Sequence, residues 1–205
     1  MKKLIVFLCL ILFSAELSAQ FMRIVPMSKK KIAAVVDHTV TSYSESNADN
    51  YEILGAGKLS GEDQWGETFQ SDGSTIDSCK FYLMKSGSPT GNAIVRLYAM
   101  TGTLGSTGVP TGAALASSNN LDVSTLTGSY QLIKFTFATP YKTSNTTDYS
   151  LSLEENVMNS SSTNYVRVGD DESSATYAGN EFYGVSGSWY AFIAGSDFCF
   201  YIYGH

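Results

Sequence analysis

Histidine is almost absent from this chain, which limits the catalytic chemistry that it can perform. The 205 residues include two histidines, His38 in a polar N-terminal stretch and His205 at the last position. A hydrolytic triad or a zinc site needs histidine on the folded scaffold, together with a partner that orients it. Glycosidase chemistry needs only two carboxylates, but the acidic residues here stand in no recognisable catalytic motif. We therefore predict that the protein is not an enzyme and has no catalytic residues.

Charged side chains are also scarce, and most of them are acidic. Only 16% of the residues are charged, and the formal net charge is −6. A chain with that balance has no basic face to neutralise phosphates, so nucleic acid is not expected as a partner. The one basic run, Lys29-Lys30-Lys31, is interpreted as three solvated lysines. The 18 glycines and 13 tyrosines are typical of an extracellular β-protein, in which glycine makes turns and aromatic residues cover strands.

Long hydrophobic runs are missing after the first twenty residues, so the mature chain is not expected to span a membrane. The start of the sequence is different, because two lysines precede an apolar run over residues 4–13 and Ala19 offers a small residue for cleavage. These are the features of a secretory signal peptide. We predict a signal peptide over residues 1–19 and a secreted, extracellular protein that begins at Gln20. A retained N-terminal anchor is the alternative, because Leu17 fits the cleavage site less well than alanine would.

The sequence does contain apolar and polar residues that alternate with a period of two. Cys79, Phe81 and Leu83 share one parity within the apolar run 76–84, and later segments such as 130–138 alternate in the same way. Residues two apart face the same side of a β-strand, so each segment has a core face and a wetter face. Together with the turns made by glycine and proline, this pattern predicts an all-β, jelly-roll-like antiparallel β-sandwich. The residues expected in its core are Phe81, Leu83, Val95, Leu97, Ile133, Phe135, Leu151, Val166, Phe200 and Ile202.

One domain is expected after the signal peptide, because the remaining length matches a typical single domain. Residues 51–205 form the predicted β-sandwich domain. For residues 20–50 we predict a linker or N-terminal arm, ordered only against the domain or against a neighbouring chain.

Four segments resemble a known family. They are GSTIDSCKFYLMKSGSPTGNAIVRLYA, VPTGAALASS, LDVSTLTGSYQLIKFTF and the terminal DFCFYIYG. Together they resemble a secreted β-sandwich module of bacterial and archaeal surface proteins and phage-like structural proteins, sometimes labelled a choice-of-anchor R domain. The resemblance covers about residues 64–204 and implies a jelly-roll-like sandwich similar to galactose-binding-like and carbohydrate-binding modules. It implies no catalytic residues, and Cys79 and Cys199 stand where the family has ordinary apolar residues.

Two cysteines, Cys79 and Cys199, remain once the predicted signal peptide is removed. A disulfide between them would be natural in the oxidising environment of an exported protein. However, Cys79 shares its parity with core residues, whereas Cys199 lies on the parity opposite to Phe198 and Phe200, and cross-strand partners must share a face. Two separate buried thiols are therefore favoured, and a bridge between the two cysteines is the alternative.

Four aromatic residues in turn-rich sequence are the candidates for ligand binding, namely Trp65, Tyr177, Trp189 and Tyr190. Sugar-binding modules stack sugar rings on exposed tryptophan and tyrosine, which offer a flat apolar surface with a polar edge. Trp189 and Tyr190 are adjacent, so at most one of them can face the core of a regular strand. The alternative is that these rings fill the core or its ends, as aromatic residues usually do.

Three consecutive acidic residues, Asp170, Asp171 and Glu172, follow a predicted strand. Calcium prefers clustered oxygen ligands, so this group is the candidate site for a structural calcium ion, and no other cofactor is expected. The alternative is that these are solvated loop charges, since their spacing matches no known calcium loop.

Two functions from different classes fit these observations. In the first, the protein is a secreted, non-catalytic binding or adhesion module that holds a glycan or another cell-surface polymer. In the second, it is a structural surface or virion-like subunit that self-associates through its N-terminal arm. Exposed aromatic rings on one face would favour the first, and an arm that docks on another chain would favour the second.

Overall fold

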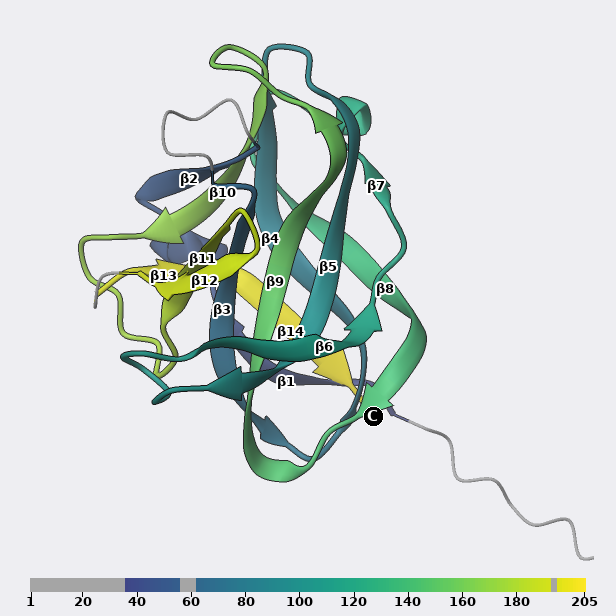
Figure 1. Cartoon of the computed structure of the whole chain (residues 1–205), viewed down its shortest axis with the longest axis vertical. Helices are drawn as coiled ribbons and strands as arrows, with labels where there is room; N and C mark the ends of the chain where they lie inside the picture. Colours follow the sequence, from purple (N-terminus) through teal and green to yellow (C-terminus); the bar gives the residue numbers. More distant parts are fainter. Residues whose placement is uncertain (1–35, 56–61, 193–194) are drawn as a thin grey trace, which may run out of the picture. The chain divides into compact units, whose positions relative to one another are not determined.

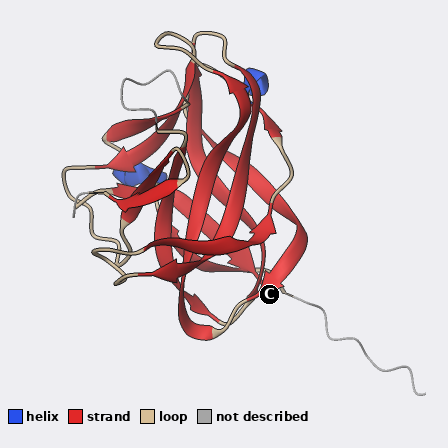
Figure 2. Cartoon of the chain, in the orientation of Figure 1, coloured by secondary structure: helices blue, strands red, loops and turns tan. Residues whose placement is uncertain are grey.

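Two antiparallel β-sheets make up most of the chain (Figure 1). The computed structural model describes residues 36–55, 62–192 and 195–205, and this part contains no α-helix (Figure 2). It contains two short 3₁₀ helices, η1 (Glu45–Asn47) and η2 (Val123–Thr125). No helix of the described part is long and apolar enough to cross a membrane. The predicted signal peptide and the first part of the predicted arm lie outside the described residues.

The first sheet has β4 at its centre. Its strands are β1 (His38–Tyr43), β2 (Asn50–Leu54), β4 (Thr75–Ser86), β8 (Gln131–Lys142), β10 (Tyr165–Asp171), β13 (Asp197–Phe198) and β14 (Phe200–Gly204). β4 pairs with β8, β10 and β14. β1 then pairs with β14, while β2 and β13 pair with β10.

The second sheet is built around β3 and β9. Its strands are β3 (Gln64–Asp72), β5 (Thr90–Thr101), β6 (Val109–Ser117), β7 (Leu121–Asp122), β9 (Asn145–Asn159), β11 (Glu181–Val185) and β12 (Ser188–Ala191). β9 pairs with both β3 and β5. β11 and β12 form a hairpin that extends the sheet beyond β3.

Successive long strands alternate between the two sheets. The chain passes from β3 in the second sheet to β4 in the first, returns with β5, and crosses again at each step from β8 to β11. This connectivity is that of a jelly-roll-like sandwich, in which the chain folds over repeatedly from one sheet to the other. The all-β sandwich predicted from the sequence is confirmed.

Glycine is required at two positions, one in the turn after β4 and one at the start of β5. Gly87 and Gly91 have φ angles of 65° and 94°, a region that other residues rarely adopt. A Cβ atom at Gly87 would lie 2.3 Å from the carbonyl oxygen of Thr163, and one at Gly91 would lie 2.0 Å from that of Val157. These two glycines therefore let β4 end in one sheet and β5 begin in the other.

The core lies between the inward faces of the two sheets. Nine of the ten residues predicted to be in it are buried, and the tenth, Ile133, is partly buried. The register agrees with the predicted parities, because Phe81 lies opposite Phe200, and Leu97 lies opposite Leu151. The alternation of apolar residues therefore identified the inward face of these strands.

Both cysteines of the described part are buried free thiols. Cys79 lies on the inward face of β4, opposite Ile202 of β14. Cys199 lies between β13 and β14, and its Sγ donates a hydrogen bond to the carbonyl oxygen of Ser44. The two thiols are separate, as the parity argument predicted, and the disulfide alternative is not formed.

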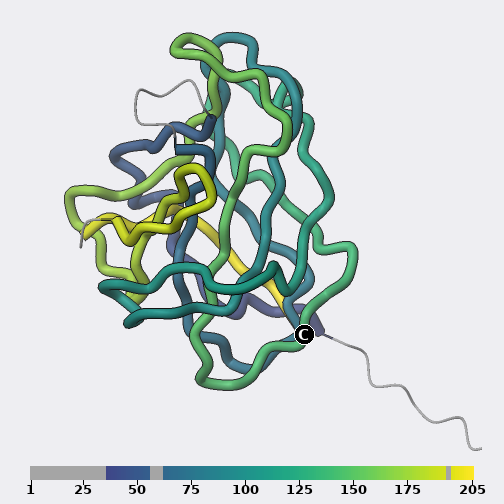
Figure 3. Tube along the Cα trace, in the orientation of Figure 1, coloured from purple at the N-terminus to yellow at the C-terminus, as the bar shows by residue number. Residues whose placement is uncertain are grey.

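Part of the predicted N-terminal arm belongs to the sandwich. β1 pairs with β14 from His38 opposite Gly204 to Tyr43 opposite Phe200, so segments far apart in the sequence lie side by side (Figure 3). Tyr43 is buried in the core. In this stretch the arm is ordered against its own domain, and the sandwich includes β1 rather than beginning at residue 51.

Candidate functional site

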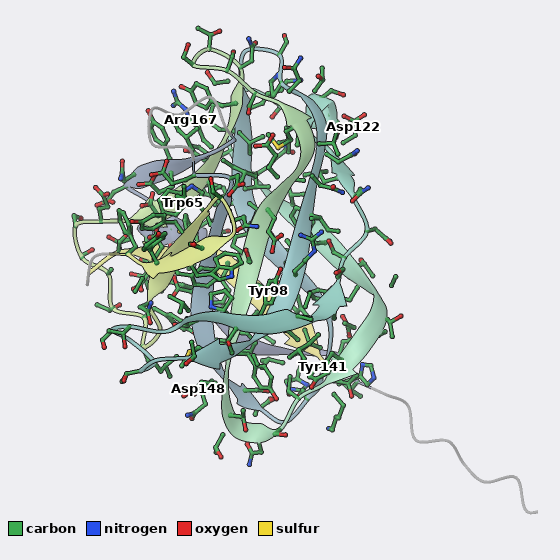
Figure 4. All side chains as sticks on the ribbon, viewed as in Figure 1. Trp65, Tyr98, Asp122, Tyr141, Asp148 and Arg167 are labelled. Carbon is green, nitrogen blue, oxygen red and sulfur yellow. The ribbon has the colours of Figure 1, made fainter. Side chains whose placement is uncertain are left out.

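Trp65 lies inside the sandwich. Its side chain is 1% exposed, and its Nε1 donates a 2.9 Å hydrogen bond to the carbonyl oxygen of Ile53. Its ring packs at centroid distances of 5.5 to 5.9 Å against Tyr183, Phe192 and Phe198. Trp65 is labelled in Figure 4. The expectation that Trp65 offers an exposed stacking face is therefore wrong, because the inward face of β3 carries this ring into the core.

The other three aromatic candidates lie in different environments. Tyr177 is partly buried, with its ring edge-on to Phe200 at 5.2 Å. Trp189 is partly buried and packs against Tyr98 at 5.7 Å, whereas its neighbour Tyr190 is 48% exposed. The strand alternation therefore separates Trp189 from Tyr190 as expected, and the four candidates do not form one exposed surface. Whether Tyr190 binds a ligand is tested by the variant Tyr190→Ala described below.

Six other tyrosines lie on the outward face of the first sheet. On β14, Phe200 and Ile202 are buried in the core, so Tyr201 and Tyr203 point outward. The same alternation turns Tyr82 of β4 outward. We call this surface the tyrosine face. Its tyrosines, each partly exposed, are Tyr51, Tyr82, Tyr130, Tyr165, Tyr201 and Tyr203.

The rings of the tyrosine face stack on one another and against basic groups. Tyr201 and Tyr203 are nearly parallel, with an interplanar angle of 9° and centroids 6.3 Å apart. The Arg167 guanidinium (labelled in Figure 4) lies 4.0 Å from the ring centroid of Tyr51 and 5.6 Å from that of Tyr165. A cation over the face of an aromatic ring is attracted to it, so these contacts favour the observed arrangement of the rings.

A hollow of about 200 Å³ opens on this face beside Tyr203. Its lining consists of Asp37, Ser78, Lys80, Lys134 and Tyr203. Lys80 and Lys134 are cross-strand neighbours, and the Lys80 Nζ lies 5.2 Å from the ring centroid of Tyr203. The Tyr203 ring forms an aromatic wall, and the carboxylate of Asp37, the hydroxyl of Ser78 and the ammonium groups of Lys80 and Lys134 surround it. The hollow can therefore contact both the apolar face of a ligand's ring and the polar groups on the edge of that ring.

A second group of functional side chains lies inside the sandwich. Glu67 shares the inward face of β3 with Trp65, and Glu181 lies directly opposite it on β11. Both glutamates are 0% exposed. The backbone amides of Thr68 and Phe198 each donate a 3.2 Å hydrogen bond to Glu67. The second sheet thus places two neighbouring carboxylates in the interior.

The first sheet contributes carboxylates to the same region. Asp170 shares its face of β10 with Val168, and Glu52 of β2 is the cross-strand partner of Val168, so both acids point inward. Asp170 is fully buried and Glu52 nearly so. Glu172 follows β10 and is exposed. One side-chain oxygen each of Glu52, Asp170 and Glu172 lie within 4.8 Å of one another.

Ser196 links the carboxylates of the two sheets. Its Oγ donates a 2.6 Å hydrogen bond to Glu181 Oε2 and lies 3.3 Å from Asp170 Oδ2. The other oxygens of these two residues, Asp170 Oδ1 and Glu181 Oε1, are buried and have no hydrogen-bond partner among the described residues. The neighbouring Asp197 accepts a 2.7 Å hydrogen bond from the backbone amide of Tyr177. We call Glu52, Glu67, Asp170, Glu181 and Asp197 the interior acidic cluster.

Burial makes four carboxylates of this cluster, those of Glu67, Asp170, Glu181 and Asp197, difficult to ionise. Burial, reinforced by neighbouring carboxylates, raises the pKa of Asp170 to about 7 and the pKa of Asp197 to about 6. The same causes raise the pKa values of Glu67 and Glu181 well above the usual range. Within the described residues, none of these four acids forms an ion pair with lysine, arginine or histidine. Their negative charges therefore repel one another without a compensating side chain.

Asp171, predicted as a calcium ligand, has a different role. Its Oδ2 accepts a 2.7 Å hydrogen bond from the Tyr43 hydroxyl, and its Oδ1 accepts hydrogen bonds from the backbone amides of Ser173 and Ser174. Burial alone would raise the pKa of Asp171, but these hydrogen bonds outweigh it and lower the pKa. Both oxygens are already bound, and strand alternation points Asp171 away from Asp170. The sequence grouped the two residues by adjacency, and the strand separates them.

Comparison with known proteins does not add a family to this description. No family model matches the chain, and no curated protein matches it. The resemblance to choice-of-anchor R modules therefore stays a prediction.

Sequence reasoning missed Glu52, Glu67 and Glu181. A signal for Glu67 was present, because Trp65, Glu67 and Phe69 share one parity of the sequence. A carboxylate on an otherwise apolar face needs a hydrogen-bonding or charged partner. Glu52 and Glu181 carried no comparable signal, since their inward orientation follows from pairing with distant strands.

Proposed function

We propose that this chain is a secreted, non-catalytic binding module that holds a glycan or a similar cell-surface polymer on its tyrosine face. The observation that carries the proposal is the hollow beside Tyr203, where the ring lies among Asp37, Lys80 and Lys134. Sugar rings have apolar C–H faces and hydroxyl edges, and this arrangement offers a partner for each. The resemblance to carbohydrate-binding modules points to the same class of ligand.

The extent of the tyrosine face favours a polymer over a single small molecule. The rings lie on neighbouring paired strands, from β14 across β4 and β10 to β2. The hollow itself is smaller than the pockets of about 300–1,000 Å³ that enclose drug-sized ligands, so it is suited to one unit of a longer chain. The basic groups of Lys80, Lys134 and Arg167 lie on this face of an acidic protein, which favours glycans that carry acidic groups.

The alternative function, a structural subunit that assembles through its N-terminal arm, has less support. Residues 38–43 of that arm pair with β14 of the same chain. In the described part of the chain, no contact indicates that the arm exchanges with a neighbouring chain. A purified protein that forms defined oligomers in the absence of any glycan would support this alternative.

Replacing Tyr203 by alanine should weaken glycan binding while the protein stays folded. The substitution removes the aromatic wall of the hollow, and losing the burial of one such ring on binding costs about 1–2 kcal/mol, or roughly 5- to 30-fold in Kd. A glycan array with neutral and acidic polysaccharides would identify the ligand, and calorimetry with that ligand would give the Kd of each variant.

Tyr190→Ala is the matched control for this experiment. Tyr190 is an exposed tyrosine on the β11–β12 hairpin, outside the tyrosine face. Its removal should leave the Kd unchanged. If Tyr190→Ala weakens binding and Tyr203→Ala does not, the ligand binds at the hairpin instead, and the proposed site is refuted.

Export is the second part of the proposed function. It rests on the basic start, the apolar run over residues 4–13 and the small residue Ala19. N-terminal sequencing of the protein collected outside the cell should give Gln20 as the first residue. Secreted material that still begins at Met1 would contradict cleavage by a signal peptidase.

A further inference from the structure

The interior acidic cluster has no role in the proposed glycan binding. Glu52, Glu67, Asp170 and Glu181 point inward between the sheets, whereas the tyrosine face lies on the outward side of the first sheet. Burying several carboxylates together is costly, because each loses its hydration and repels the others. A group that the binding function does not use and that opposes folding requires its own explanation.

Two buried oxygen atoms of the cluster lack a hydrogen-bond partner among the described residues. Asp170 Oδ1 and Glu181 Oε1 are buried without a hydrogen-bond partner in the described part of the chain. The second oxygens of the same carboxylates both approach the Ser196 hydroxyl, so the two acids face each other from opposite sheets. Buried polar atoms in folded proteins nearly always have a partner, and two unpartnered carboxyl oxygens on acids that share the Ser196 hydroxyl point to a bound cation.

We propose that the interior acidic cluster binds one calcium ion, with Asp170 and Glu181 as the central ligands. Glu52 and Glu172 complete the site, since their oxygens and one oxygen of Asp170 lie within 4.8 Å of one another. Calcium–oxygen distances are about 2.3–2.6 Å, so a single ion can contact oxygens at that spacing. The ion would connect β10 of the first sheet to β11 of the second. This proposal is independent of glycan binding.

The ligand atoms of the proposed site are carboxylate oxygens, which favour calcium over zinc and magnesium. Every group named is a carboxylate, which suits a hard cation, and neither histidine of the chain belongs to the cluster. Calcium accepts six to eight oxygens in irregular geometry, whereas magnesium needs a near-octahedral shell and keeps several waters. The exposed Glu172 lies at the outer end of this group and gives a hydrated ion a first point of contact.

Thermal unfolding of the full chain with and without calcium tests the proposal. In EDTA at neutral pH the wild-type protein should have a low Tm, and calcium chloride should raise it. At a calcium concentration about 100 times the Kd, the rise should be roughly 5–10 °C for a protein of this size. Magnesium chloride at the same concentration should give a smaller rise, and calorimetry should show one calcium ion bound per chain.

Asp170→Asn should raise the Tm measured in EDTA and abolish the further rise that calcium causes in wild type. In EDTA the variant should melt at a higher temperature than wild type, because one buried negative charge has been removed. The calcium-induced rise should be lost, with the affinity lowered at least about 100-fold, since even residues that only support a metal ligand change affinity by about 10- to 100-fold. Glu181→Gln should behave in the same way and serves as the second variant if Asp170→Asn does not fold.

Two control variants distinguish this site from others. Asp148→Asn changes an exposed end of β9 (labelled in Figure 4), where Asp148 accepts a hydrogen bond from Gln70, and it should leave the calcium response intact. Asp77→Asn removes an acid from a separate group with Asp37 and His205, and it should also leave the response intact. The proposal is overturned if wild type shows no calcium response, if Asp77→Asn abolishes it, or if both cluster variants retain it.

Discussion

Replacing Trp65 by alanine should destabilise the protein by about 3–5 kcal/mol, which is the usual cost of removing a buried tryptophan side chain. The ring is 1% exposed and packs against three other aromatic rings. The variant also loses the hydrogen bond from Nε1 to the carbonyl oxygen of Ile53. Since small proteins are stable by only about 5–15 kcal/mol, urea unfolding should show a large fall in the midpoint.

Two further variants define the cause of this loss. Trp65→Phe keeps an aromatic ring but not the indole N–H, so it should cost clearly less than Trp65→Ala. Tyr190→Ala removes an exposed ring and should change the free energy of unfolding by no more than about 0.5 kcal/mol. If Trp65→Ala unfolds at the same urea concentration as wild type but no longer binds a glycan, Trp65 would be a ligand-binding residue after all.

The free energy of unfolding in EDTA should fall as the pH rises from about 4 to about 7. Asp170 has a folded pKa of about 7 and Asp197 one of about 6, whereas an aspartate in an unfolded chain has a pKa near 3.9. Between those values the folded state binds more protons than the unfolded state, so stability decreases with rising pH. Between its unfolded and its folded pKa, each carboxyl lowers the free energy of unfolding by at most about 1.4 kcal/mol per pH unit.

The carboxylates around Asp170 act in the same direction. Glu52 and Glu172 raise the pKa of Asp170, and Asp170 in turn raises the pKa of Glu181. The hydrogen bond from the Ser196 hydroxyl opposes this effect but does not outweigh it. Burial also raises the pKa values of Glu67 and Glu181 well above their usual range, which extends the decline towards higher pH.

Urea unfolding at a series of pH values, all in EDTA, measures this slope. Asp170→Asn should flatten it between about pH 4 and pH 7, because the group that titrates there is gone. Asp148→Asn should leave it unchanged. A wild-type protein whose stability stays constant or rises over this range would mean that the cluster does not bind protons as described.

The strands and their inward faces were predictable from the sequence because they depend on local alternation. Phe81, Leu83 and Val95 were assigned to the core from a period of two, and all three are buried there. The same rule separated Trp189 from Tyr190. Alternation cannot tell, however, which of two faces a neighbouring element will cover. Trp65 was expected on the surface because its surroundings are rich in turn residues, yet β3 carries it inward.

The interior acidic cluster was not predictable because it depends on which strands meet. Glu67 and Glu181 become neighbours only when β3 pairs with β11, and Asp170 reaches them only when the first sheet packs on the second. Adjacency in the sequence instead grouped Asp170 with Asp171, which points to the other side of β10. The acids that share this interior region come from parts of the chain with no local relation to one another.

The position of β14 limits when this protein can fold during its synthesis. β14 follows every other strand in the sequence, yet it lies between β1 and β4 in the first sheet and contributes Phe200 and Ile202 to the core. The first sheet therefore stays incomplete until residues 200–204 have left the ribosome, and its long-range pairings form slowly. The core of the sandwich therefore closes only after nearly all of these strands have been synthesised, which leaves the unfinished chain accessible to holding chaperones.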